Sequence, residues 1–148
     1  MPSGIYIKSD GITPALHDWA TGLVNPRNIM SVSGVVKSVI VSRTLSGVSS
    51  KGTKFPDYSA GYKRWKTGQG YPATPNLSLT GEMMGDIQIN IISPTFAVLF
   101  FGSRLSAAKA HKHHTGKFPF FDVQKKEYAN LYAALLANIK RLKGYGEV

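Results

Sequence analysis

Three histidines lie within four residues of one another, at His111, His113 and His114. Neutral imidazole is a common ligand of transition metals, so this cluster could bind a metal ion. It could also supply the general base of a nuclease or contact a phosphate group. A metal site needs a further ligand, and the nearest carboxylate in the sequence is Asp122. We interpret the cluster as a solvated, partly charged helix end, and we predict no metal and no cofactor.

A second candidate group is basic and aromatic, and it lies in a glycine- and proline-rich stretch between residues 51 and 71. Single-stranded nucleic acid binds such a mixture, because cations contact phosphates and rings stack on bases. Protein interfaces are enriched in the same rings and in arginine, and a loop can also pack on its own core through them. We favour an interface or loop packing, because no ordered nucleic-acid-binding motif is present. The candidate interface or DNA-facing residues from both groups are Lys51, Lys54, Tyr58, Tyr62, Lys63, Arg64, Trp65, Lys66, His111, His113, His114 and Lys117.

Recognisable catalytic patterns are missing from the sequence. It has no P-loop, no complete dinucleotide-binding glycine motif and no serine nucleophile elbow. The eight carboxylates are scattered and form no obvious acid/base pair. The absence of cysteine excludes disulfides, thiolate metal sites and a cysteine nucleophile. We therefore predict that the protein is not an enzyme and has no catalytic residues.

The bulk composition points to one basic domain. A chain of 148 residues fits a single compact unit spanning residues 1–148. Its net charge of +10 favours polyanions or acidic protein surfaces as partners. The first residues lack a signal-peptide pattern, and the longest apolar run, near residues 96–101, is too short to span a bilayer. We expect a product made in the cytoplasm that makes no contact with a membrane.

The elements that would position these groups can be read from the periodicity of the chain. Residues 1–24 are predicted to form a short N-terminal arm. Asn25 and Pro26 are typical of a helix start, and the apolar residues from 29 to 40 continue at helical spacing. Residues 46–77 are predicted to form a long loop with little regular structure. Alternating isoleucines from residue 87, a turn at Ser93-Pro94-Thr95 and an apolar run over 96–101 predict an antiparallel hairpin.

The last third of the chain predicts two helices. Ser103 is a good cap for a helix over residues 104–112, and Gly116 ends that stretch. Residues 118–123 are apolar and extended. Residues 124–143 form the clearest helix, with an apolar stripe that includes Tyr128, Leu131 and Tyr132. The predicted fold class is α+β: a small, mostly antiparallel sheet packed against two or three helices, with a long Gly/Pro-rich loop.

The order of these signals resembles that of a known family. The relevant strings, all in residues 26–143, are Phe55-Pro56-Asp57-Tyr58-Ser59, Tyr62-Lys63, Asn76-Leu77-Ser78-Leu79-Thr80-Gly81-Glu82-Met83-Met84, Ala110-His111-Lys112-His113-His114-Thr115-Gly116 and Phe118-Pro119-Phe120-Phe121. Each string is short, and their order carries the likeness. Together they resemble the virion-morphogenesis proteins of tailed bacteriophages, which include neck, head–tail connector, tail-completion and minor tail subunits. That family often has Pro-Arg before the aromatic residue near Phe120, and this chain has no arginine there.

The resemblance implies a structural virion protein that forms a cyclic homo-oligomer at the head–tail junction or in the tail. The implied partners are portal or adaptor proteins and tail-tube or tail-terminator proteins, with non-specific contact to packaged DNA. It also implies that the terminal helix covers the sheet, that Leu79 and Met83 anchor the sheet entrance, and that the loop orders on a neighbouring subunit. Two alternatives stay open: a basic nucleic-acid-binding module using the Lys51–Tyr71 loop and the His111–Lys117 segment, and a small His-dependent hydrolase or nuclease.

Overall fold

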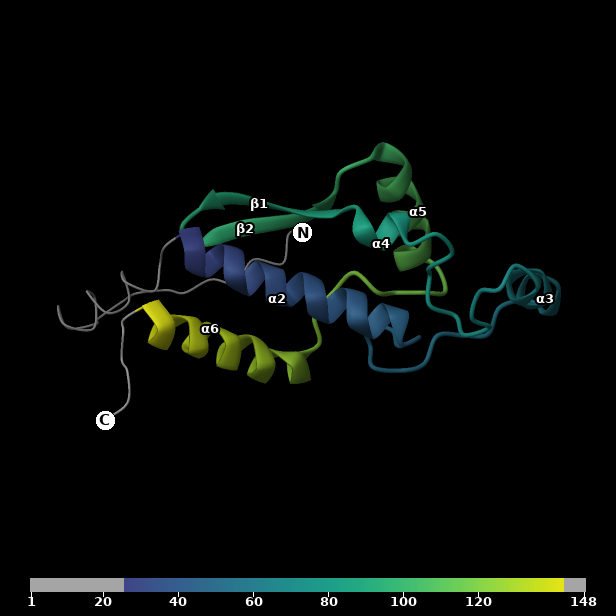
Figure 1. Cartoon of the computed structure of the whole chain (residues 1–148), viewed down its shortest axis with the longest axis horizontal. Helices are drawn as coiled ribbons and strands as arrows, with labels where there is room; N and C mark the ends of the chain where they lie inside the picture. Colours follow the sequence, from purple (N-terminus) through teal and green to yellow (C-terminus); the bar gives the residue numbers. More distant parts are fainter. Residues whose placement is uncertain (1–25, 143–148) are drawn as a thin grey trace.

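The structure is a computed structural model that describes residues 26–142 of the chain. The predicted N-terminal arm over residues 1–24, the cap at Asn25 and the helix end at Lys143 lie outside the described residues. Helix α2 (Pro26–Leu45) forms the middle layer, between a β-hairpin on one side and helix α6 (Tyr128–Leu142) on the other (Figure 1). The predicted α+β class is confirmed.

Helix α2 fits a middle layer because it buries residues on both of its sides. Ile40 belongs to the main hydrophobic core, and Val36 and Val41 pack against that core. Small polar side chains, including Ser33 and Thr44, are buried along the same helix. The Thr44 hydroxyl donates to the Ile40 carbonyl at 2.7 Å, so burial leaves this polar group satisfied. The helical spacing read from the sequence is confirmed here.

The predicted hairpin is also confirmed. Strand β1 (Ile87–Ser93) pairs antiparallel with β2 (Phe96–Phe101), in a register that places Ile87 opposite Phe101 and Ile91 opposite Ala97. The register shifts between Ile91 and Ser93, next to the turn. Ile87 is almost fully buried, and α2 covers one face of the hairpin.

Two short helices flank the hairpin. Helix α4 (Glu82–Gly85), which the sequence did not predict, follows Gly81, whose φ of 80° suits a residue without a side chain. Helix α5 (Arg104–Thr115) begins at the predicted cap, where the Ser103 side chain accepts a hydrogen bond from the Ser106 amide. It ends at Thr115, three residues beyond the predicted end at Lys112, and Gly116 is its C-cap, as predicted.

The C-terminal helix is present as predicted, but it packs differently. A 3-10 turn, η1 (Lys125–Glu127), precedes α6, and Gln124 and Glu127 form a capping box there. Helix α6 packs on α2 rather than over the hairpin, because α2 already covers that face (Figure 1). Leu131 is buried, whereas Tyr128 and Tyr132 are more than half exposed. The expectations that the terminal helix covers the sheet and that these tyrosines share its buried stripe are therefore wrong.

A buried arginine ties the layers together. Arg43 on α2 makes an ion pair of 2.6 Å with Glu127, and its guanidinium also donates to the Phe120 and Asp122 carbonyls. Phe120 itself is fully buried in the core. These bonds hold the start of α6 and the extended segment before it against α2. They also compensate the buried charge of Arg43, which would be costly without partners.

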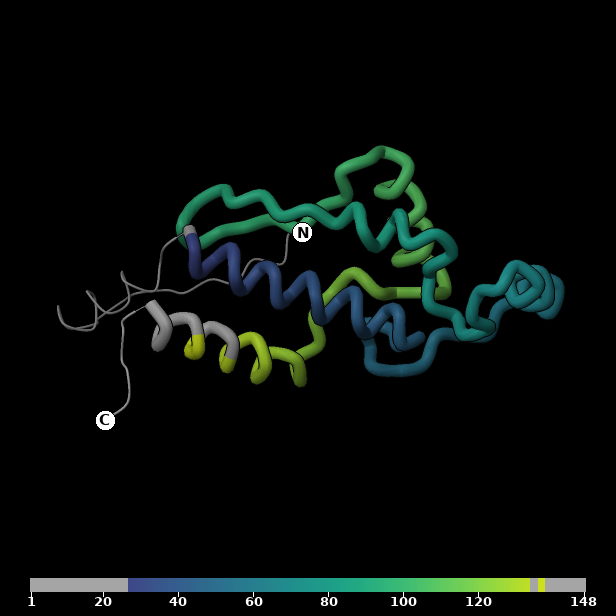
Figure 2. Tube along the Cα trace, viewed as in Figure 1, coloured from purple at the N-terminus to yellow at the C-terminus, as the bar shows by residue number. Residues whose placement is uncertain are grey.

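The prediction of an irregular loop over residues 46–77 is wrong in its centre. Helix α3 (Ala60–Gly68) forms there, capped by Ser59, whose hydroxyl accepts a hydrogen bond from the Tyr62 amide at 3.4 Å. The glycines lower helix propensity by about 1 kcal/mol each, and tertiary contacts described below offset that cost. We call residues 56–76 the arm. Figures 1 and 2 show the chain running out to α3, at one end of the molecule, and returning.

Within residues 26–142, no helix has the length and hydrophobicity needed to cross a membrane.

Candidate functional site

The arm is fastened at its root by a buried lysine. Lys66 is fully buried, and its Nζ donates to the Asn76 side-chain oxygen at 2.9 Å. The same ammonium lies 4.9 Å from the centre of the Tyr58 ring, a distance that allows a cation–π interaction. Burial lowers the pKa of Lys66. Lys66 was predicted to face a partner or DNA, and the structure corrects this, because its charge is already used inside the chain.

Tyr58 completes this root. Its hydroxyl accepts hydrogen bonds from the backbone amides of Asn76 and Leu77, both at 3.3 Å. Burial raises the pKa of Tyr58, although the two amide hydrogen bonds work in the opposite direction. Its ring also packs at 6.0 Å from the Phe118 ring. The outgoing and returning segments of the arm are thus joined where they leave the body.

The tip of the arm presents aromatic surface to solvent. Tyr62 is 38% exposed and Trp65 is 49% exposed, although both are large apolar side chains. Their rings lie 5.5 Å apart, and the Tyr62 ring lies 4.9 Å from that of Tyr58. The spacing of three residues puts the Tyr62 and Trp65 rings on one side of α3. This is the kind of rigid amphipathic surface that protein interfaces use.

The other predicted cations of this region have different surroundings. Arg64 is exposed on α3, whereas Lys63 forms an exposed ion pair with Asp57 at 3.6 Å. Lys51 and Lys54 are exposed but lie outside the arm, in a turn closed by a bridge between Val48 and Lys54. The structure therefore does not bring the predicted basic and aromatic residues of this stretch into one continuous surface.

The three histidines of α5 point to different surroundings. His111 is exposed, as are the nearby Lys112 and Lys117. His114 accepts hydrogen bonds at Nδ1 from the backbone amides of Phe120 and Phe121, at 3.3 and 3.2 Å, so it fixes the chain after α5. Among residues 26–142, no three His, Cys, Asp or Glu side chains come together in a way that could hold a metal ion.

His113 faces the body instead. Its ring packs edge-on against Phe118, with centroids 5.8 Å apart. Burial lowers the pKa of His113, and the positive charge of Lys112 lowers it further. A neutral His113 is thus favoured next to the root of the arm.

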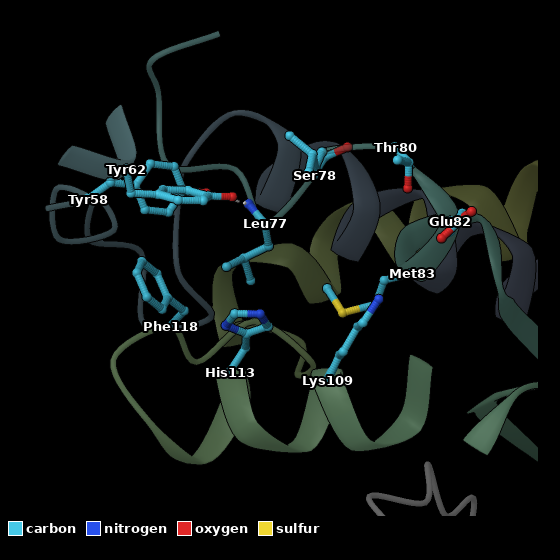
Figure 3. Close-up of a pocket in the computed structure, with 12 residues that line it drawn as sticks. Tyr58, Tyr62, Leu77, Ser78, Thr80, Glu82, Met83, Lys109, His113 and Phe118 are labelled. Carbon is cyan, nitrogen blue, oxygen red and sulfur yellow. Dashed lines mark hydrogen bonds between the residues drawn. The ribbon is translucent and has the colours of Figure 1, made fainter. Parts of the chain in front are cut away.

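A cavity of about 340 Å³ separates the arm root from α5 (Figure 3). Lys109 and His113 rise into it from α5, opposite Leu77 and the Tyr58–Tyr62 pair (Figure 3). Its walls are mostly apolar. No local sequence pattern predicts this cavity, because three separate segments line it. The lining residues are Tyr58, Tyr62, Leu77, Ser78, Leu79, Thr80, Gly81, Glu82, Met83, Lys109, His113 and Phe118.

The resemblance also implied roles for Leu79 and Met83 at the sheet entrance. Met83 is buried in the core next to Ile87, which fits an anchor. Leu79 is only partly buried and lines the cavity. Met83 also lines the cavity, so the two residues share that environment and differ in how deeply they are buried.

Comparisons of the chain with protein-family models, with curated proteins and with solved structures found no match. The fold and the surfaces described above therefore carry the functional argument.

Proposed function

We propose that the protein is a structural virion protein of a tailed phage: a ring-forming neck, connector or tail-completion subunit that joins the DNA-filled head to the tail. The observation that carries the proposal is the pre-ordered arm, which is locked at its root by Lys66 and Tyr58 and exposes Tyr62 and Trp65 at its tip. The order of sequence motifs gives separate support, through the resemblance to virion-morphogenesis proteins.

A locked arm suits assembly for an energetic reason. Association costs free energy for every loop or side chain that must be ordered at the interface. The Lys66–Asn76 and Tyr58 hydrogen bonds order the arm before any partner arrives. An arm that projects from one end of a subunit also suits a head-to-tail contact, which closes into a ring when the rotation between subunits allows it.

Under this proposal the arm contacts the next copy of the chain in the ring. The remaining partners are portal or adaptor proteins on one side and tail-tube or tail-terminator proteins on the other. The protein is made in the host cytoplasm and ends in the virion. No step of this role requires a catalytic residue, a metal or a cofactor.

The test is a double substitution at the arm tip, Tyr62→Ser with Trp65→Ser. Both side chains are exposed, so we expect the melting temperature to stay within about 4 °C of the parent. We expect the native mass to drop from a closed oligomer to the monomer. Leu105→Ser is the matched control, since Leu105 is 65% exposed on α5, outside the arm, and this variant should still assemble. A double variant that assembles like the parent would refute the role of the arm.

The alternative of a nucleic-acid module built on the Lys51–Tyr71 loop loses support from the geometry. Two of its cations are engaged within the chain: Lys66 is buried, and Lys63 is paired with Asp57. The Tyr58 and Tyr62 rings meet edge to face and the Trp65 ring lies tilted beside Tyr62, so these rings contact one another rather than standing apart to receive bases. For a His-dependent hydrolase or nuclease, the histidines of α5 would have to act together, and they diverge.

A further inference from the structure

Helix α5 and the turn after it carry a run of cations with no carboxylate between Ser103 and Phe121. Ser106 and Ala110 form the buried side of this helix. The cations lie away from that side, and all of them are exposed. They are Arg104, Lys109 and Lys112 on α5 and Lys117 in the turn after it, with the exposed His111 beside them.

The carboxylates on neighbouring elements leave most of this face unopposed. Asp86 accepts a hydrogen bond from the Ser103 amide at 2.8 Å and so stands at the first turn of α5. Glu82 on α4 lines the cavity together with Lys109. Among the described residues, the ion pairs that we find involve neither Lys112 nor Lys117. The positive charge is therefore concentrated toward the C-terminal half of α5 and the turn that follows.

The residue types on this face decide which polyanion it fits. Protein interfaces are depleted in lysine and enriched in Tyr, Trp and Arg, and the arm tip has that composition. The exposed side of α5 has no Tyr, Trp or Phe; it carries Lys109 and Lys112, and Lys117 follows in the turn. Lysine and arginine side chains are the usual contacts to nucleic-acid phosphates, which position a protein without reading sequence.

We propose that the exposed face of α5, together with Lys117, binds the phosphate backbone of duplex DNA without sequence preference. A 12-residue helix is about 18 Å long. Duplex DNA carries one negative charge per about 1.7 Å, so phosphates are available along the whole of α5. The inference assigns to one face of the molecule the non-specific DNA contact that the resemblance implied, and it does not depend on the ring, because a single subunit carries the entire face.

The test is a salt titration of binding to a mixed-sequence DNA duplex, followed by fluorescence anisotropy. Three α5-region lysines are replaced in the variant Lys109→Gln/Lys112→Gln/Lys117→Gln. Losing three phosphate contacts should reduce the slope of log K against log salt by about 3 and weaken binding at low salt at least ~10-fold. The control, Lys51→Gln/Lys54→Gln/Lys63→Gln, removes the same charge elsewhere and should keep the parental slope.

Several outcomes would overturn the proposal. Absence of DNA binding by the parent protein is one, and an equal loss in both triple variants is another, since binding would then follow net charge alone. Polyglutamate that competes as well as duplex DNA would assign the face to an acidic protein surface. These outcomes are separate from the native-mass test. If the protein is a monomer that binds DNA through α5, the ring is refuted and the DNA-binding inference stands.

Discussion

The arm and helix α5 are both basic, yet the fold uses their charges in opposite ways. In the arm, Lys66 is buried against Tyr58 and Asn76, and the aromatic side chains at the tip are exposed. In α5 the lysines are exposed, and His113 and His114 turn toward the body. The number of cations in a segment therefore does not show what those cations bind. Their burial decides whether they hold the chain or meet a partner.

The two regions meet at one aromatic side chain. Phe118 packs at 5.5 Å from Phe55, at 6.0 Å from Tyr58 and at 5.8 Å from His113. It therefore contacts the base of the arm and the end of α5 at once. The following residues are held in turn by Arg43, so the positions of both regions depend on the core beneath them.

The largest effect should come from removing that support. Arg43→Met leaves the buried Glu127 carboxylate with the Gln124 amide but without its cationic partner, and it frees the Phe120 and Asp122 carbonyls. Breaking a buried pair in this way costs about 3–5 kcal/mol, and we expect this loss in the free energy of unfolding. Arg27→Met on the exposed side of α2 is the control and should be nearly neutral. Denaturant unfolding measures both, and a loss below about 1 kcal/mol for Arg43→Met would contradict this account of the core.

Two lysine substitutions, one in the arm and one on α5, test the difference between these regions directly. Lys66→Ala removes a buried side chain, its hydrogen bond to Asn76 and its contact with Tyr58, so we expect a loss of about 1–3 kcal/mol. Lys112→Ala on α5 should change stability by no more than about 0.5 kcal/mol. Chemical denaturation of the two variants side by side gives the answer. Equal effects would mean that the arm lysine does not hold the root.

A smaller effect should follow from removing one hydroxyl at the arm root. Tyr58→Phe leaves the Asn76 and Leu77 amides without their acceptor, which costs about 1–2 kcal/mol. Tyr62→Phe changes a ring of the same kind at the exposed tip and should cost less than about 0.5 kcal/mol. Hydrogen exchange adds a local measurement, since the amides of Asn76 and Leu77 should exchange faster only in Tyr58→Phe. If these two amides exchange at the parental rate in Tyr58→Phe, the Tyr58 hydroxyl does not hold the arm root together.

The smallest expected effect is a dependence of stability on pH through His113. Its folded-state pKa lies below the unfolded value of about 6.5, because burial and Lys112 disfavour the charged form. The unfolded chain therefore binds the proton more readily, and stability is complete above pH ~6.5 and is lost as the pH falls through the lowered folded-state pKa. We expect His113→Gln to flatten this decline and the exposed His111→Gln to leave it. Thermal unfolding between neutral and mildly acidic pH tests this, and a decline unchanged in His113→Gln would rule it out.

Local signals in the sequence were enough for much of this fold. The isoleucine alternation from Ile87, the turn at Ser93 and the cap at Ser103 are effects of near neighbours, and each predicted its element correctly. Helix α3 was missed because its glycines weaken the local signal, whereas Lys66 and Asn76, ten residues apart, fasten it. The middle position of α2 was missed for a similar reason, since it depends on contacts between distant helices.

The candidate site residues show the same difference between local signals in the sequence and contacts that only the fold creates. The sequence identified Trp65 and Lys117 as candidates, and both are exposed. It also identified Lys66 and His114, whose side chains prove to make internal hydrogen bonds. Lys109 and Arg104 were missed, because they stand apart from the dense clusters. Only the turn of α5 places them on the same exposed face as the other cations.

The proposed assembly into a closed oligomer is tested most directly by the native mass of the intact protein. The mass should be measured over a wide range of concentrations, with and without duplex DNA. We expect a closed oligomer of one defined size that forms without DNA, because the arm is already ordered for a contact with the next copy. A monomer at every concentration, which gains mass only by binding DNA, would contradict the assembly role and leave a basic DNA-binding protein in its place.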